Sequence, residues 1–405
     1  MERKMKDSGI EWIGKIPEEW ELLQLKHYCY VNNGKEIGKE LEKDSIEVID
    51  VFGSGGVFKY TDKFLYDGEA VLFGRKGTLG KPIYVNQKFW TVDTMYYLTF
   101  GNKLYPKFNY YQLIAFDWKP YITQTALPSV VATQIVSCKF VFPVYKEQKK
   151  IADYLDEKVS EINAVISKTK ESIEEYKKYR KSIVIKAVTK GLHSNVTMKK
   201  TDSDWIGEIP AHWNYVRIQN LFETVDERNE DENAILLSLY TALGVKPRNE
   251  LEEKGNKAST VVNYKKVKKN DVIVNKLLAW MGAIGYSDYE GVTSPDYDVY
   301  RAREGANVVR NYYNEYFRNT CFNGDCYKYG HGIMLMRWRT YPEEFLRIKV
   351  PNPPLEEQQE IADYLNQKCT EIDTLIAKKE AFVLEMESYK KSLIYEYVTG
   401  KKEVL

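Results

Sequence analysis

The sequence predicts an α+β protein in which two globular domains are joined by two long helices packed as an antiparallel coiled coil, with a pseudo-twofold internal repeat. Three features of the 405 residues predict this fold. The length exceeds that of one ordinary domain, a long segment with helical periodicity occurs twice, and short β-branched segments precede each of the two copies.

The repeat is long and ungapped. IADYLDEKVSEINAVISK at 151–168 matches IADYLNQKCTEIDTLIAK at 361–378, and the match continues to Thr189 and Thr399. A second piece, DSGIEWIGKIPEEW at 7–20, matches DSDWIGEIPAHW at 202–213. The regions between these pieces, 21–142 and 214–352, differ in length and share no evident similarity. The chain therefore contains two variable regions inside a duplicated frame.

Each copy of the long segment has the heptad periodicity of a coiled-coil helix. Neither copy contains Pro or Gly before Gly191 and Gly400, which are typical helix stops. At 1.5 Å per residue each helix is a rod of roughly 60 Å, which cannot bury its seam alone, so we expect the two helices to pair. The seams are Leu155, Val159, Ile162, Ile166, Thr169, Ile173, Tyr176, Arg180, Ile183 and Ala187, and Leu365, Cys369, Ile372, Ile376, Lys379, Val383, Met386, Lys390, Leu393 and Tyr397.

The variable regions contain short β-branched and aromatic segments, such as FWTVDTMYYLTF and DVIVNKLLAW, separated by Gly, Asn and Asp. This pattern predicts mixed α+β domains with exposed loops. We expect a first domain at 1–143, a first spacer helix at 144–191, a second domain at 192–353 and a second spacer helix at 354–400.

Composition limits the functional classes. Hydrophobic content of 43% and charged content of 29% are ordinary for a globular protein. No apolar run is long enough for a membrane span, and the polar start lacks the apolar core of a secretory signal, so we expect a cytoplasmic protein without membrane contact. The net charge of +1 is weak for a free-standing DNA binder, so other chains would share any phosphate contacts.

No catalytic or metal site is expected. Cys321, Cys326 and His331 offer three ligands where a structural zinc site needs four. Asn352-Pro353-Pro354 occurs in amino-methyltransferase motifs, but the following aromatic residue and a glycine-rich cofactor loop are both missing, so we interpret it as a proline-bounded helix start. We therefore expect no catalytic residue, no metal and no cofactor.

Some loop residues are suited to nucleic acid. The segment from Gly74 to Gly80, GRKGTLG, combines glycines that permit close backbone approach with two cations and a hydroxyl. The same pattern is also typical of a turn that has no role in binding. In the second variable region Trp280 and Tyr297 could equally be core aromatics. Lys265, Lys266, Lys268 and Lys269 are more simply a solvated face. The candidates from these considerations are Arg75, Lys76, Thr78, Asn275, Lys276, Trp280, Ser294, Tyr297, Arg301 and Arg337.

The layout resembles the specificity subunit of type I restriction-modification systems over essentially the whole chain. The most specific residues are the two junctions, Pro143-x-x-x-Glu147-Gln148-x-x-Ile151-Ala152-Asp153-Tyr154-Leu155 and Pro353-x-x-x-Glu357-Gln358-x-x-Ile361-Ala362-Asp363-Tyr364-Leu365. The opening Trp-Ile-Gly-x-Ile-Pro-x-x-Trp and the stretch Thr125-Ala126-Leu127-Pro128-Ser129 also look like that family. The resemblance adds Ser129 to the DNA-contact candidates.

The resemblance implies that each domain binds one half of a bipartite double-stranded DNA target, while the helices set the spacing. Half-sites one DNA turn apart lie about 34 Å from each other. It also implies two methyltransferase subunits on the helices, two restriction (motor-nuclease) subunits in the full assembly, and no catalysis by this chain. The junction residues Glu147, Gln148, Tyr154, Glu357, Gln358 and Tyr364 become candidate partner contacts.

Two other functions are open at this point. A single-chain methyltransferase would need the cofactor loop and catalytic tetrapeptide that we do not find. A coiled-coil adaptor with two protein-binding domains would explain the near-neutral charge. DNA binding in the presence of partner subunits distinguishes the adaptor from the specificity subunit.

Overall fold

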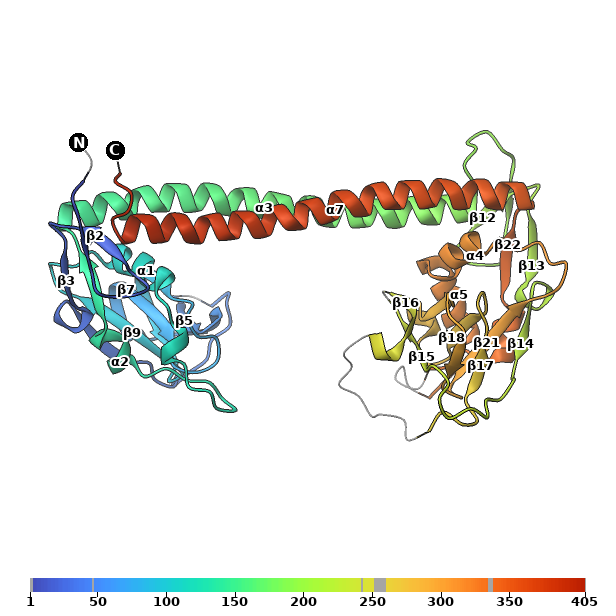
Figure 1. Ribbon diagram of the computed structural model, residues 1–405, viewed down its shortest axis with the longest axis horizontal. Coiled ribbons are helices and arrows are strands. Elements are labelled where there is room, and N and C mark those ends of the chain that lie inside the picture. Colours follow the sequence, from blue (N-terminus) through green and yellow to red (C-terminus); the bar gives the residue numbers. More distant parts are fainter. Residues whose placement is uncertain (1–2, 46, 242, 251–259, 334–337, 405) are drawn as a thin grey trace. The chain divides into compact units, whose positions relative to one another are not determined.

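The computed structural model describes residues 3–45, 47–241, 243–250, 260–333 and 338–404. The chain divides into two compact units. The first unit is Met1–Glu171 together with Lys379–Leu405, and the second unit is Ser172–Lys378. Each unit contains one sheet-rich domain and a part of both long helices (Figure 1).

The two predicted long helices are confirmed as α3 (Tyr145–Lys190) and α7 (Leu355–Val398). Both end at a glycine with a left-handed backbone, Gly191 at φ 74° and Gly400 at φ 72°. A side chain is strained at such a φ, which explains why glycine stops each helix. Among the described residues, no helix combines the length and the apolar character that a membrane span requires.

Within each unit, α3 and α7 run antiparallel. In the first unit, Lys170 pairs with Glu387 at 3.3 Å and Lys390 donates to Asn163 at 2.8 Å. In the second unit, Arg180 pairs with Asp373 at 2.9 Å. Five of the seam isoleucines are buried between the helices, as the heptad pattern predicts: Ile162, Ile166, Ile173, Ile372 and Ile376. Ile183, near the end of α3, is only partly buried.

The polar seam positions pair in the same way in both units. Arg180 and Lys390 occupy equivalent positions of the sequence repeat, and so do their partners Asp373 and Asn163. Polar residues in a coiled-coil seam specify register, because a shifted pairing separates each of them from its partner. These two contacts therefore favour one displacement of each helix along the other.

The first domain is built on a six-stranded sheet in the order β4-β9-β7-β8-β5-β6. Helix α1 (Pro106–Ala115) packs on β7 and β8 and is tied to α3, since both Lys107 and Tyr111 contact the Asp156 carboxylate. The short helix α2 (Ala132–Ser137) packs against β4. The strands are β4 (Cys29–Asn33), β5 (Ile49–Gly53), β6 (Gly56–Thr61), β7 (Tyr66–Gly74), β8 (Ile83–Thr91) and β9 (Met95–Phe100).

The second domain contains a four-stranded sheet in the order β14-β21-β18-β19 and two two-stranded antiparallel sheets, β15-β16 and β17-β20. The helices that cover it bury an aromatic cluster that includes Tyr312, Tyr313 and Phe317. The elements are β14 (Phe222–Val225), β15 (Leu237–Tyr240), β16 (Gly244–Pro247), β17 (Lys265–Val267), β18 (Val272–Asn275), β19 (Ile284–Tyr286), β20 (Gly291–Thr293), β21 (Tyr297–Ala302), α4 (Arg310–Phe317), α5 (Thr320–Tyr329) and α6 (Pro342–Arg347).

The two domains share a sheet order that their sequences do not reveal. The order β4-β9-β7-β8 in the first domain corresponds to β14-β21-β18-β19 in the second. In each case the third of these strands pairs antiparallel with the second, through Gly74↔Met95 and Asn275↔Tyr297. The variable regions are therefore two versions of one topology, and β7 is the counterpart of β18.

The repeated opening segments form equivalent hairpins. Strand β1 (Met5–Asp7) pairs with β2 (Lys15–Pro17), and β11 (Met198–Lys200) pairs with β12 (Glu208–Pro210). The strand that follows each hairpin along the chain pairs with the strand that precedes a long helix. These pairs are β3 (Glu21–Gln24) with β10 (Lys139–Phe142), and β13 (Asn214–Arg217) with β22 (Lys349–Asn352). The first and last strands of each domain therefore lie side by side, next to the start of its long helix.

The glutamine of each junction motif holds its domain to its helix. Gln148 is buried, accepts from the backbone N–H of Tyr105 just before α1, and donates to the Lys103 and Pro143 carbonyls. Gln358 does the same in the second unit, with the N–H of Val309 before α4 and the carbonyls of Asn307 and Pro353. One side chain therefore satisfies three backbone groups at each junction.

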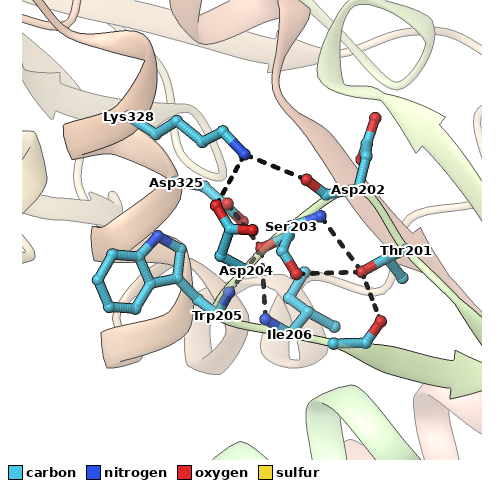
Figure 2. A network of polar contacts seen from close by, with 9 residues as sticks. Thr201, Asp202, Ser203, Asp204, Trp205, Ile206, Asp325 and Lys328 are labelled. Atoms are coloured by element: carbon cyan, nitrogen blue, oxygen red, sulfur yellow. Dashed lines mark hydrogen bonds and ion pairs between the residues drawn. The ribbon is translucent and has the colours of Figure 1, made fainter.

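Figure 2 shows how the second opening segment is anchored to α5. Ser203 Oγ donates to Asp325 Oδ1 at 2.7 Å and accepts from the backbone N–H groups of Trp205 and Ile206. Lys328 contacts Asp204 Oδ2 at 3.0 Å and the Asp202 carbonyl. Asp325 is buried, and its second oxygen has no hydrogen-bond partner among the residues that the structure describes. Burial raises the pKa of this carboxyl from 3.8 to about 6.

This raised pKa makes Asp325 a pH-dependent destabilising group. A carboxyl group whose pKa is higher in the folded state than in the unfolded state destabilises the folded protein once the pH exceeds its pKa in the unfolded state. For Asp325 the full destabilisation is present above pH 6. The shift corresponds to roughly 2–3 kcal/mol. We therefore expect Asp325→Asn to unfold at a higher temperature than the wild type at pH 8, with that advantage shrinking towards pH 4. A difference in Tm that is the same at both pH values would contradict this assignment.

Candidate nucleic-acid interface

In the first domain, a loop with two cations follows the central strand β7. Gly74 ends the strand, and a Cβ at that position would lie 2.5 Å from the Thr78 carbonyl oxygen, so the chain can turn back this tightly only with glycine. Gly77, at φ 85°, makes the next bend. The Thr78 N–H donates to Ser54 Oγ at 3.2 Å, which ties the loop to the turn between β5 and β6.

A second loop comes to the same place from far along the chain. Lys76 and Ser129 form an isolated antiparallel bridge, and the Val130 N–H donates to the Arg75 carbonyl at 3.0 Å. The hydroxyls of Thr123 and Ser129 lie 3.0 Å apart. The structure thus brings together all four candidates predicted in this domain, Arg75, Lys76, Thr78 and Ser129.

Electrostatically, the two cations of this cluster are available to a ligand. Arg75 and Lys76 are both exposed, and neither has an ion pair with any carboxylate in the described part of the chain. The Arg75 guanidinium lies over the Tyr96 ring, 5.9 Å from its centroid. Two unpaired cations beside several hydroxyls can bind phosphate oxygens and the edges of guanine.

In the second domain, the corresponding loop follows β18. The Thr340 N–H donates to the Lys276 carbonyl at 3.0 Å, just as Val130 donates to Arg75. Thr340 and Val130 are structurally equivalent, because each lies two residues before the short helix that precedes a junction, α6 and α2 respectively. Lys276 therefore occupies the place of Arg75. Asn275 is buried, and its side-chain oxygen accepts from the Leu277 N–H at 3.0 Å. The buried Asn275 side chain therefore stabilises the conformation of the loop.

Ser294 and Tyr297 lie at this same end of the sheet. They form the turn that leads into β21, where the Tyr297 N–H donates to the Ser294 carbonyl at 2.9 Å. Trp280, in the short 3-10 helix η5 (Ala279–Met281), is half-buried: its indole N–H donates to the Leu277 carbonyl and its ring packs on Tyr327. Trp280 therefore supports the loop, and part of it is still accessible.

Arg301 does not join this cluster. Its guanidinium forms two 2.8 Å hydrogen bonds with Asp271 and also binds Glu227. Asp271 precedes β18 whereas Asn275 ends it, so Arg301 lies at the opposite end of the strand pair. Four residues of extended strand separate Arg301 from Tyr297, a span of roughly 13 Å. Arg337, the remaining candidate, lies outside the described residues.

The structure corrects the expectation for Lys265 and adds two threonine hydroxyls to the candidate site. Lys265 was expected on a solvated face together with its neighbours, but it is buried and pairs with the buried Asp298 at 2.9 Å. Thr123 and Thr125 join the hydroxyls around Ser129 and were not among the candidates. Thr125 could have been found from the same Thr-Ala-Leu-Pro-Ser stretch that gave Ser129.

The predicted partner contacts fall into two groups. Glu147 accepts from the Trp20 indole and Arg3, and Glu357 contacts His212 at 2.9 Å, so the glutamates, like Gln148 and Gln358, are bound within the chain. The tyrosines differ from each other. Tyr154 packs against Tyr397, whereas Tyr364 lines an open pocket.

One flank of the helix pair carries exposed apolar side chains. Each of them directly precedes a seam residue, so all lie on the same side of the seam; we call this side the apolar flank. In the first unit it contains Val165, Phe382 and Tyr389, and in the second Tyr179 and Leu375, each between 41% and 58% exposed. Exposed apolar side chains in such an arrangement are typical of protein interfaces.

The comparisons with known proteins agree with this architecture. Residues 17–175 match the family model of the type I restriction modification DNA specificity domain. The putative type I restriction enzyme MjaX specificity subunit of Methanocaldococcus jannaschii is 26% identical, over 97% of this chain and 96% of that protein. The MjaVIII specificity subunit of the same organism is also 26% identical, over 52% of this chain and 50% of that protein.

Two solved structures have the same fold. A chain from work on complex assembly and conformational transition of the type I R-M system superposes with a TM-score of 0.72 at 13% identity, covering 96% of this chain and 99% of that one. The HsdS subunit of Thermoanaerobacter tengcongensis gives a TM-score of 0.54, also at 13% identity, covering 98% of this chain and all of that one. Residues 17–175 therefore match the type I restriction modification DNA specificity domain, and the chain as a whole is similar to the specificity subunits of these systems.

Proposed function

We propose that this chain is the DNA sequence-specificity subunit of a type I restriction-modification complex. Its two domains, 1–143 and 192–353, each bind one half of a bipartite DNA target, and the spacer helices, 144–191 and 354–400, set the distance between the halves and dock methyltransferase subunits. The observation that carries this proposal is the equivalence of Arg75 and Lys276. The two variable regions have unrelated sequences, yet each presents a cation on the equivalent loop, after the equivalent strand of its own sheet.

The residues around these cations suggest different target sequences. In the first domain Arg75 is accompanied by Lys76 and by the hydroxyls of Thr78 and Ser129. In the second, Lys276 is accompanied by Ser294, Tyr297 and the half-buried Trp280. Arg presents a rigid planar fork of donors to the edge of guanine, whereas Lys presents a flexible point charge, so the two are not interchangeable in base recognition. We infer that the two half-sites differ in sequence and that the full target is asymmetric.

The helices provide the proposed partner surface. The apolar flank has a part in each unit, at equivalent positions such as Val165 and Leu375, or Tyr179 and Tyr389, which supports two methyltransferase subunits per chain. Because Gln148 and Gln358 are buried within the chain, we leave them out of this surface. We assign methyl transfer and DNA cleavage to the partners, with two restriction subunits in the full cytoplasmic assembly and no cofactor held by this chain.

Alanine substitutions at the two cations test whether the domains read separate half-sites. We expect Arg75→Ala to weaken binding to duplexes that contain the first half-site, and Lys276→Ala to weaken binding through the second. Loss of one such contact corresponds to about 1–3 kcal/mol, or roughly 5- to 150-fold in affinity. The measurement is fluorescence anisotropy of the complex with its methyltransferase subunit, on duplexes in which either half-site is scrambled.

The matched control for these variants is Lys63→Ala. Lys63 is exposed but lies just before β7, at the end of that strand away from Arg75, so its removal changes the charge equally without touching the loop. Equal losses at both half-sites in Arg75→Ala would contradict separate readers. Sequence-independent loss in both cation variants would limit them to phosphate contacts.

Heptad insertions test the spacing role. Seven residues inserted after Ile166 alone should break the register that Arg180 and Lys390 specify, and assembly should fail. Equal insertions after Ile166 and Ile376 restore the register and lengthen the pair by about 10 Å, or roughly three base pairs. We expect sequencing of methylated adenines to show the same two half-sites with a longer gap. An unchanged gap in the double insertion would rule out the helices as the spacer.

A further inference from the structure

An open pocket lies on the second unit, where the last turns of α3 meet the first turns of α7. Its volume is about 380 Å³, and its lining includes Tyr179, Ile183, Ala187, Leu192 and Tyr364. Lys186 and Ser182 form part of its wall. Tyr179 belongs to the apolar flank and is 58% exposed, so the pocket opens directly onto that flank.

The equivalent place in the first unit is filled by a side chain of this same protein. There Tyr154 corresponds to Tyr364, and Tyr397 corresponds to Ala187. The rings of Tyr154 and Tyr397 pack with their centroids 4.7 Å apart, and their hydroxyls lie 3.2 Å from each other. Tyr397 is almost fully buried. The pocket in the second unit therefore exists where alanine replaces the tyrosine ring.

The first unit also indicates which kind of side chain fits the pocket of the second unit. A ring that packs on the tyrosine of this junction finds apolar walls from the helix pair and a hydroxyl to bond, as Tyr397 does. Aromatic side chains that fill such pockets provide much of the binding energy of protein interfaces. Lys186 is exposed and has no acidic partner among the described residues, so it favours an acidic residue beside the incoming ring.

We propose that an aromatic side chain of the methyltransferase subunit inserts into this pocket and packs on Tyr364. This inference rests on the proposed function, since it identifies how one partner subunit docks. The continuity of the pocket with the apolar flank places the ring within the surface already assigned to that subunit. The two docking sites are then unequal: the second unit receives a ring from its partner, whereas the first unit supplies its own ring, Tyr397.

The test fills the pocket and counts the bound subunits. Ala187→Tyr copies the arrangement of the first unit, so the new ring has a place over Tyr364. Native mass spectrometry and calorimetric titration of the full chain with the methyltransferase subunit should show two subunits bound to the wild type. In Ala187→Tyr we expect one of the two sites to weaken at least tenfold, while the other keeps its affinity.

Two further variants separate the pocket from effects on folding. Ser182→Trp blocks the pocket from an exposed position, so it should reproduce the loss even if Ala187→Tyr disturbs the buried seam. Lys178→Trp is the matched control. It adds the same ring to the same helix at an exposed position that is not part of the pocket lining, and it should bind like the wild type.

The outcomes distinguish this inference from the function on which it rests. If the wild type binds no methyltransferase subunit, the proposed function fails. If the wild type binds two subunits and the folded Ala187→Tyr and Ser182→Trp variants bind both with unchanged affinity, the pocket is not a docking site. If these variants change only the association of the chain with itself, the occupant is a second copy, and the inference is overturned as well.

Discussion

The register between α3 and α7 is the constraint on which the rest of the structure depends. Each helix carries an apolar seam that it cannot bury alone, and the seams become a core only when the helices pair. Apolar contacts alone would tolerate a shift by one heptad. The contacts of Arg180 with Asp373 and of Lys390 with Asn163 do not, because a shift would separate each cation from its partner. Polar residues thus specify a pairing that the apolar residues stabilise.

The same duplication that fixes the helices frames both domains. Gln148 and Gln358 each bind three backbone groups where a domain meets its helix, and the opening hairpins repeat strand for strand. Inside this frame the sheet order is kept while the loop residues change. Arg75 and Lys276 occupy one place with different neighbours. Such an arrangement lets the exposed loops vary without altering how the domains are held.

The helices could be predicted from the sequence, because a heptad pattern is local and recurs in both copies. The sheet order could not: Glu223 pairs with Arg301 across a long stretch of chain, and no local pattern encodes that partner. The sequence alone could group candidates that share one loop, as Arg75, Lys76 and Thr78 do. It could not group candidates whose position along a strand decides their place, since Arg301 is close to Tyr297 in sequence yet lies at the opposite end of the strand pair.

Methylome sequencing of a host that expresses this chain with its methyltransferase subunit, compared with a host that expresses the methyltransferase subunit alone, tests whether this chain specifies a DNA target. We expect methylated adenine at a single split motif with two different halves, and only when this chain is present. A folded complex of both proteins that methylates no new motif would rule out the specificity role and favour a protein-binding adaptor.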